Sequence, residues 1–255
     1  MRICLISRDF PKGTDQSDVA TFVHDLALGL QEIGHEVVVI SLSGNDLDRC
    51  VGNQKITVHR VAWHNLLNEQ QMLLTVMPST HHILKPAIAI WQKFCELPQT
   101  QPFDVVETPE LFAEGLFVCL TKAAPLVVRL HAPHFKFVND KLLNTTGKFD
   151  HDFIGFIERL TLIAADRVIC PSEELAANIS SNLDYPLSNI EIAREPLHTT
   201  RFNPDGTKAL ERQIIAQQAT VLYENVTTNY WCGKRFALYR KPVSSLFPSA
   251  IDLFA

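Results

Sequence analysis

Two histidines stand directly after an apolar run of the sequence. The run 125–130 ends at Leu130, and His131 and His134 follow it with three-residue spacing. A metal site would need at least one more well-placed ligand, and neither an H-E-x-x-H motif nor a His/Cys set accompanies these two. We expect His131, at the end of a strand, to donate a hydrogen bond to a substrate hydroxyl or phosphate. His134 is a second candidate for substrate binding, and no metal site is predicted.

Glu107 ends the preceding run, 103–107, and Glu110 follows three residues later. Carboxylates three residues apart at a strand-to-helix junction could bind sugar hydroxyls or act as acid and base. Glu110 could equally belong to the first turn of a helix, where the helix dipole favours negative charge. Both stay candidates for substrate binding.

The segment 8–17 leads from the first apolar run to the start of a helix and contains Lys12 and Gly13. A helix N-terminus has free N–H groups that could receive a phosphate, which makes these two residues candidates for substrate binding. The segment matches neither G-x-G-x-x-G nor the P-loop pattern, so a capped, solvated loop is the alternative.

Ser172 could be taken for a nucleophile, but it lacks the G-x-S-x-G elbow. Its context, Pro171-Ser172-Glu173-Glu174, is typical of a helix N-cap followed by acidic residues in the first turn. We therefore interpret Ser172 as a cap.

Short apolar runs rich in β-branched residues alternate with segments of helical period, which indicates parallel strands with crossover helices. In an open parallel sheet, ligands bind at the carboxyl ends of the strands near the switch in strand order, so the loops after the first, fourth, fifth and sixth expected strands are the first candidates for a site. We predict an α/β fold with one Rossmann-like, doubly wound, mainly parallel sheet. Its seven expected strands are 2–7, 36–41, 56–61, 103–107, 125–130, 166–170 and 189–193.

The first crossover helix has clear boundaries, with Ser17 as N-cap and Gly34 just after its end. Its apolar residues recur at helical spacing and form one face. Further helices are expected at 110–122, 152–165, 173–182 and 208–223, and in pieces over 66–97, where Pro78 and Pro86 should interrupt the helix.

Composition limits the class of protein. The chain has 255 residues, 46% of them apolar and 20% charged, which is typical of a packed globular protein. Its net charge of −5 supplies no positive field for nucleic acid. No uninterrupted apolar run of about 18 residues predicts a membrane span, although peripheral membrane contact stays open. Six scattered cysteines and the lack of a signal-peptide core indicate a cytoplasmic protein.

Residues 1–205 are expected to form the α/β domain, and residues 206–255 a tail that is partly helical and too short for a second complete domain. The segment 208–255 holds six basic and three acidic residues and is rich in aromatic side chains. It shows no alternation of strands and helices after the expected helix.

Read in order, the segments resemble the N-terminal domain of the family 4 retaining glycosyltransferases of the GT-B fold. The resemblance spans about residues 1–205. The segments that carry it are 8–11 (Arg-Asp-Phe-Pro), 28–37, 103–110 with Glu114-Gly115, 125–131, 158–159, 165–172 and 201–204 (Arg-Phe-Asn-Pro).

The resemblance implies an acceptor-binding domain, with a nucleotide sugar as donor substrate and no other cofactor. It places His131 toward the transferred sugar, as the catalytic candidate. Two departures matter: the family's glycine pair is replaced around 13–17, and the donor-binding motifs expected after Pro204 do not follow. Since preorganised positive charge stabilises the departing diphosphate, we expect no turnover by this polypeptide alone.

Three interpretations stay open. The chain could be an acceptor-binding domain from a truncated or split enzyme, completed by a separate donor-binding polypeptide. It could instead be a non-catalytic carbohydrate-binding or scaffold protein that kept half of the fold. A third alternative is another GT-B-like enzyme, such as a sugar-nucleotide epimerase, with a shortened second half.

Overall fold

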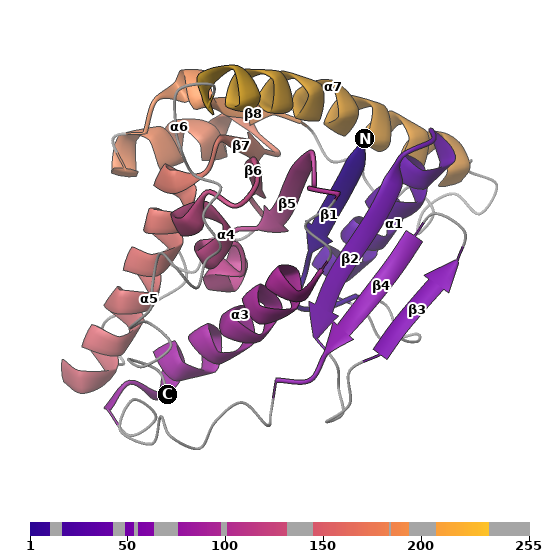
Figure 1. Cartoon of the computed structure of the whole chain (residues 1–255). Coiled ribbons are helices and arrows are strands. Elements are labelled where there is room, and N and C mark those ends of the chain that lie inside the picture. Colours follow the sequence, from indigo (N-terminus) through magenta and orange to yellow (C-terminus); the bar gives the residue numbers. More distant parts are fainter. Residues whose placement is uncertain are drawn as a thin grey trace.

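In a computed structural model, the protein has an α/β fold built on one mixed sheet (Figure 1). The structure describes residues 1–10, 17–42, 49–53, 56–63, 76–97, 101–131, 145–183, 185–193 and 208–234. Among these, the strands are β1 (Arg2–Ile6), β2 (Glu36–Leu42), β3 (Arg49–Asn53), β4 (Ile56–Val61), β5 (Val105–Pro109), β6 (Leu126–Arg129), β7 (Arg167–Cys170) and β8 (Ile190–Ile192).

The sheet has the order β3-β4-β2-β1-β5-β6-β7-β8. All seven predicted strands form and pair in parallel, which confirms the predicted fold class. The strand β3 was not predicted and pairs antiparallel with β4 at the edge. Its sequence, Arg-Cys-Val-Gly-Asn, is short and polar, so it carries little of the apolar signal by which buried strands are found.

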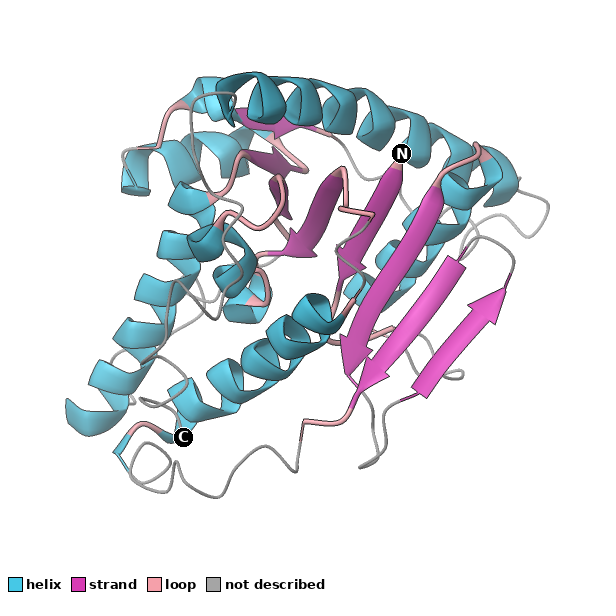
Figure 2. Ribbon diagram, viewed as in Figure 1, coloured by secondary structure: helices cyan, strands magenta, loops and turns pink. Residues whose placement is uncertain are grey.

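Helices cover both faces of the sheet (Figure 2). One apolar cluster joins the sheet to α1 (Asp18–Glu32) and α7 (Lys208–Lys234). The other joins the opposite face to α3 (Pro78–Glu96), α4 (Leu116–Thr121), α5 (Thr145–Ala164) and α6 (Glu173–Leu183). The central strands are therefore buried on both sides, which explains their continuous β-branched runs.

The predicted caps are confirmed. The Ser17 side chain accepts a hydrogen bond from the Ala20 N–H at 3.1 Å, and Gly34 has a positive φ of 102° just past α1. Ser172 Oγ accepts from the Leu175 N–H at 3.2 Å, as expected for the N-cap of α6.

Two helix predictions were wrong. Pro86 does not interrupt α3: it lies inside the helix and is buried, and α3 packs on β2 and α5, so tertiary packing offsets the lost backbone bond. Pro78 instead starts α3, where its missing N–H has no helical partner to lose. The expected helix 110–122 is divided into a 3₁₀ turn, η2 (Leu111–Ala113), and α4, because Phe112 and Ala113 have positive φ.

The helix α7 is longer than the 208–223 expected from the sequence and packs directly on the domain. Its Ala216, Ala219 and Tyr223 are buried in the same cluster as α1 and the central strands. Gly29 permits this close approach: a Cβ there would lie 2.4 Å from the Arg212 carbonyl oxygen. The helix therefore covers β5 and its neighbours on the α1 side of the sheet.

Candidate active site

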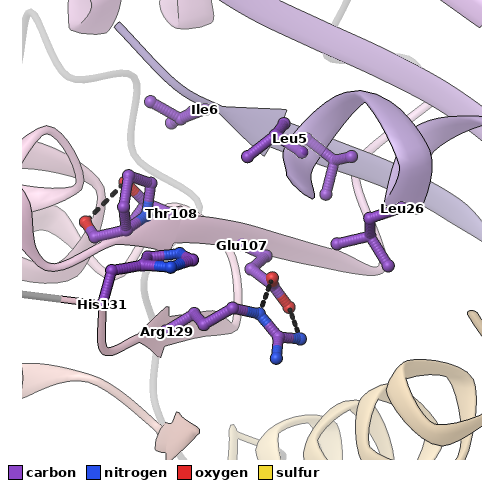
Figure 3. Close-up of a pocket in the computed structure, with 9 residues that line it drawn as sticks. Leu5, Ile6, Leu26, Glu107, Thr108, Arg129 and His131 are labelled. Atoms are coloured by element: carbon purple, nitrogen blue, oxygen red, sulfur yellow. Dashed lines mark hydrogen bonds and ion pairs between the residues drawn. The ribbon is translucent and has the colours of Figure 1, made fainter. Parts of the chain in front are cut away.

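A pocket lies at the carboxyl ends of β1, β5 and β6 (Figure 3). This is the switch point of the sheet, because the strand order runs from β1 to β2 in one direction and from β5 to β6 in the other. Ligands of doubly wound sheets bind at this position. The lining residues are Leu5, Ile6, Val23, Leu26, Glu107, Thr108, Pro109, Arg129 and His131.

An ion pair between neighbouring strands forms one wall of the pocket. Arg129 Nε on β6 donates to Glu107 Oε1 on β5 at 2.7 Å, and Arg129 Nη2 lies 3.3 Å from Glu107 Oε2. Both side chains are only 5% exposed. A buried pair of this kind is costly to desolvate, so its stability depends on satisfying all of its polar atoms.

The helix α7 supplies a further bond to this pair. The Tyr223 hydroxyl donates to Glu107 Oε2 at 2.5 Å. Burial and the adjacent Glu107 charge raise the pKa of Tyr223 well above its ordinary value, so the phenol stays a proton donor. Both oxygens of Glu107 are therefore bonded within the protein.

Aromatic contacts connect the ion pair to His131. The Arg129 guanidinium lies 4.7 Å from the centre of the Phe22 ring, and Phe22 meets the His131 ring edge-on at 5.5 Å. Burial, and then the positive charge of Arg129, lower the pKa of His131 to about 4. The imidazole is therefore neutral at pH 7, with one nitrogen that can donate and one that can accept.

Glu110 holds the backbone on which His131 sits. Its Oε2 accepts from the His131 N–H at 2.9 Å, and its own N–H donates to the Arg129 carbonyl at 3.0 Å. The Glu110 side chain is buried, at 1% exposure of the residue. The geometry brings Glu107, Glu110 and His131 together, while the roles of all three in catalysis or substrate binding stay predictions.

A second arginine–glutamate pair lies beyond β1. Arg8 Nε and its backbone N–H donate to the two oxygens of Glu114, at 3.1 Å and 2.8 Å. The Arg8 guanidinium also lies 4.0 Å from the centre of the Phe112 ring. Burial raises the pKa of Glu114 to about 7, although Arg8 opposes the shift.

Three predicted site residues, Lys12, Gly13 and His134, lie outside the described residues. Their roles stay predictions. Within the described ranges, no group of three or more His, Cys, Asp and Glu side chains is arranged to hold a metal ion.

The sequence reasoning missed four residues of this edge: Arg8, Glu114, Arg129 and Tyr223. Arg129 could have been found from the sequence, since a charged residue inside a buried apolar strand requires a partner. Tyr223 had none, because 116 positions separate it from Glu107.

Comparison with known proteins decides the family. Residues 19–201 match Glycosyltransferase Family 4. The chain belongs to this family. A search of curated proteins found no match. The match confirms the resemblance to family 4 glycosyltransferases that the motifs indicated.

Solved structures agree on the fold. A sucrose-phosphate synthase structure from Thermosynechococcus elongatus has a TM-score of 0.53 and 15% identity, covering 88% of this chain and 98% of that one. A second structure of sucrose-phosphate synthase from the same organism has a TM-score of 0.54 and 14% identity, covering 81% of this chain and 53% of that one. The family 4 chain therefore spans about half of this second structure, consistent with one domain of a GT-B protein.

Among the described helices, none combines the length and the apolar character needed to cross a membrane.

Proposed function

We propose that this chain is the acceptor-binding lobe of a glycosyltransferase that transfers a sugar, with retention, from a nucleotide sugar. One observation carries the proposal: the pocket with His131 lies at the switch point, at the carboxyl ends of β1, β5 and β6. Membership of glycosyltransferase family 4 supports the same class of reaction.

The side chains of the pocket suit a carbohydrate. A neutral His131 offers a hydrogen-bond donor and an acceptor, and sugar hydroxyls can be both. Leu5, Val23 and Leu26 form the buried apolar wall behind His131. Glu110 fixes the backbone of His131, so the imidazole is preorganised for binding.

The donor nucleotide needs positive charge for its diphosphate. Arg129 is paired with the buried Glu107, so its charge is offset within the protein. We propose that a donor-binding lobe outside residues 1–255 supplies this charge, and that residues 1–255 alone show no turnover. A cytoplasmic location is part of the proposal, because nucleotide sugars are then available as donors.

Calorimetry with the 255-residue chain tests the proposal. We expect millimolar binding of simple sugars that His131→Ala weakens at least fivefold, and nucleotide-sugar binding weaker than micromolar. His82→Ala is the control, because His82 is exposed on α3, away from the pocket. Sugar binding that His131→Ala does not weaken, or micromolar nucleotide-sugar binding, would contradict the proposal.

One observation favours a second candidate, a non-catalytic carbohydrate-binding protein. Both oxygens of Glu107 and one oxygen of Glu110 are bonded within the protein. Sugar binding without turnover, even when a family 4 donor-binding lobe is added, would support this alternative.

A further inference from the structure

The helix α5 lies along one side of the molecule and is apolar on its outer surface as well as toward the core (Figure 1). Its inner residues Ile154 and Leu162 are buried, at 1% and 0% exposure. Its outer residues Phe149, Phe156 and Ile163 are 59%, 55% and 55% exposed. A surface helix normally presents polar side chains to water, so the outer side of α5 has the composition of an interface.

The exposed residues belong to a continuous row, which we name the α5 stripe. It consists of Phe149, Phe153, Phe156, Leu160 and Ile163, in alternating steps of four and three residues. The ring centres of Phe149 and Phe153 are 6.4 Å apart, and those of Phe153 and Phe156 are 6.0 Å apart. Phe153 and Leu160 also pack partly against a small apolar cluster from η2 and α4. Steps of four and three residues form the seam along which one helix packs against another.

The α5 stripe is complementary to a second copy of itself. Phe149 and Ile163 lie at equal distances in sequence from Phe156, and the exposed Asp152 and Arg159 lie on either side of Phe156. Two α5 helices that run antiparallel about a two-fold axis near Phe156 therefore bring Asp152 of each copy to Arg159 of the other. A parallel pair would instead place identical charges at the same height.

The charges beside the stripe favour a protein partner over a lipid surface. The exposed Lys148, Asp152 and Arg159 alternate in sign along the helix. Helices that lie on membranes are rich in Lys and Arg on their polar face, so that the face is attracted to anionic lipid. Alternating charges instead fit a partner that carries the opposite alternation in a fixed register.

We propose that the α5 stripe is a dimer interface, in which α5 of a second copy of this chain packs antiparallel against it. The proposal goes beyond the proposed function and does not depend on it. Phe156 lies at the two-fold axis, where buried aromatic side chains contribute most to binding. A single pair of helices buries less surface than a standard stable interface, so the dimer forms reversibly.

Sedimentation velocity of the 255-residue chain, from micromolar to submillimolar concentration, tests the proposal. We expect a monomer–dimer equilibrium that Phe156→Glu weakens at least tenfold, because two carboxylates would meet at the axis. Val221→Glu is the matched control, since Val221 is 61% exposed on α7, which packs on the opposite face of the sheet. It should leave the equilibrium unchanged. A chain that stays monomeric throughout, or a dimer that Phe156→Glu leaves intact, would overturn the proposal.

Exchange of the two charges tests the antiparallel arrangement. Asp152→Arg alone and Arg159→Asp alone should each weaken self-association, because like charges then face one another across the two-fold axis. An equimolar mixture of these two variants should form a heterodimer, since each Arg then meets an Asp of the other variant. Native mass spectrometry distinguishes the two variants by mass. A mixture that contains no excess of heterodimer over homodimers would overturn the antiparallel pairing.

A vesicle experiment identifies the other possible occupant of the stripe. Vesicles that contain phosphatidylglycerol should not bind the chain, and their addition should leave the dimer intact. Binding of a monomer to these vesicles that Phe156→Glu abolishes and Val221→Glu retains would overturn the dimer and assign the α5 stripe to a membrane surface.

Discussion

The hydroxyl of Tyr223 donates to the carboxylate of Glu107 across 116 positions of sequence, at 2.5 Å. The bond joins α7 to the wall of the pocket, because Glu107 also pairs with Arg129. The last described helix is therefore part of the site's supporting structure.

Removing the Tyr223 hydroxyl should destabilise the fold. In Tyr223→Phe the buried Glu107 loses a partner, and we expect the free energy of unfolding to fall by about 1.5–3 kcal/mol, as for a hydrogen bond to a charged group. Tyr230→Phe is the control, since Tyr230 lies on the same helix and bonds the Lys122 carbonyl at 2.7 Å. It should cost about 1 kcal/mol, the usual value for a neutral bond. Urea unfolding measures both, and equal losses would contradict the role of Glu107.

Breaking the Glu107–Arg129 pair should cost more. Arg129→Met leaves a buried carboxylate without its charge partner, with an expected loss of about 3–5 kcal/mol. Adding Glu107→Gln in the same chain should recover part of the loss. Arg2→Met, which breaks a pair with the half-exposed Glu36, should cost at most about 1 kcal/mol. A double variant as unstable as the sum of its single variants would show that the two side chains are not coupled.

His131 should make the fold less stable in acid. Its pKa is about 4 when folded and about 6.5 when unfolded, so the unfolded chain binds more protons between these values. Stability should therefore fall as pH drops from 6.5 to 4, by up to about 3 kcal/mol from this residue. Urea unfolding at pH 7 and pH 4.5, compared with His131→Gln, isolates the contribution. A folded-state titration of His131 by NMR near pH 6.5 would refute it.

The titration of Glu114 should have the opposite effect on the pH dependence of stability. Its pKa is raised from 4.5 to about 7 in the folded state, so the folded chain binds more protons between these values. Its contribution is greatest below pH 4.5 and decreases as pH rises toward 7. Relative to Glu114→Gln, the wild type should lose stability between pH 5 and pH 7. An unchanged difference between the two proteins over that range would show that Glu114 titrates normally.

The approach of α7 to α1 depends on Gly29. In Gly29→Ala the new Cβ would meet the Arg212 carbonyl, so α7 must shift and its amides should exchange faster with solvent. Gly34→Ala strains a positive φ but meets no atom within 4 Å, so it should leave exchange in α7 unchanged. Hydrogen exchange read by mass spectrometry distinguishes the two. The same protection of α7 in both variants would contradict the packing role of Gly29.

Local sequence patterns predicted most of the fold. The β-branched runs gave the seven parallel strands, and Ser17, Gly34 and Ser172 gave helix boundaries, because these signals depend on neighbours in sequence. The predicted break at Pro86 was wrong because the packing of α3 offsets the free-energy cost of a proline inside a helix. The turn at Phe112 and Ala113 depends on contacts that no local pattern encodes.

The site was predicted less completely. Glu107 lies in β5, and Glu110 and His131 follow β5 and β6, so the topology brings the three residues together. The partners that determine their chemistry, Arg129 and Tyr223, come from other elements and were found only in the structure.

Mapping of sugar binding on the isotope-labelled chain tests the central claim most directly. If the chain is an acceptor-binding lobe, added carbohydrate should shift the backbone amide signals of Ile6, Thr108 and His131, at the carboxyl ends of β1, β5 and β6. Shifts confined to the amino ends of these strands, or no shifts at millimolar sugar, would contradict it.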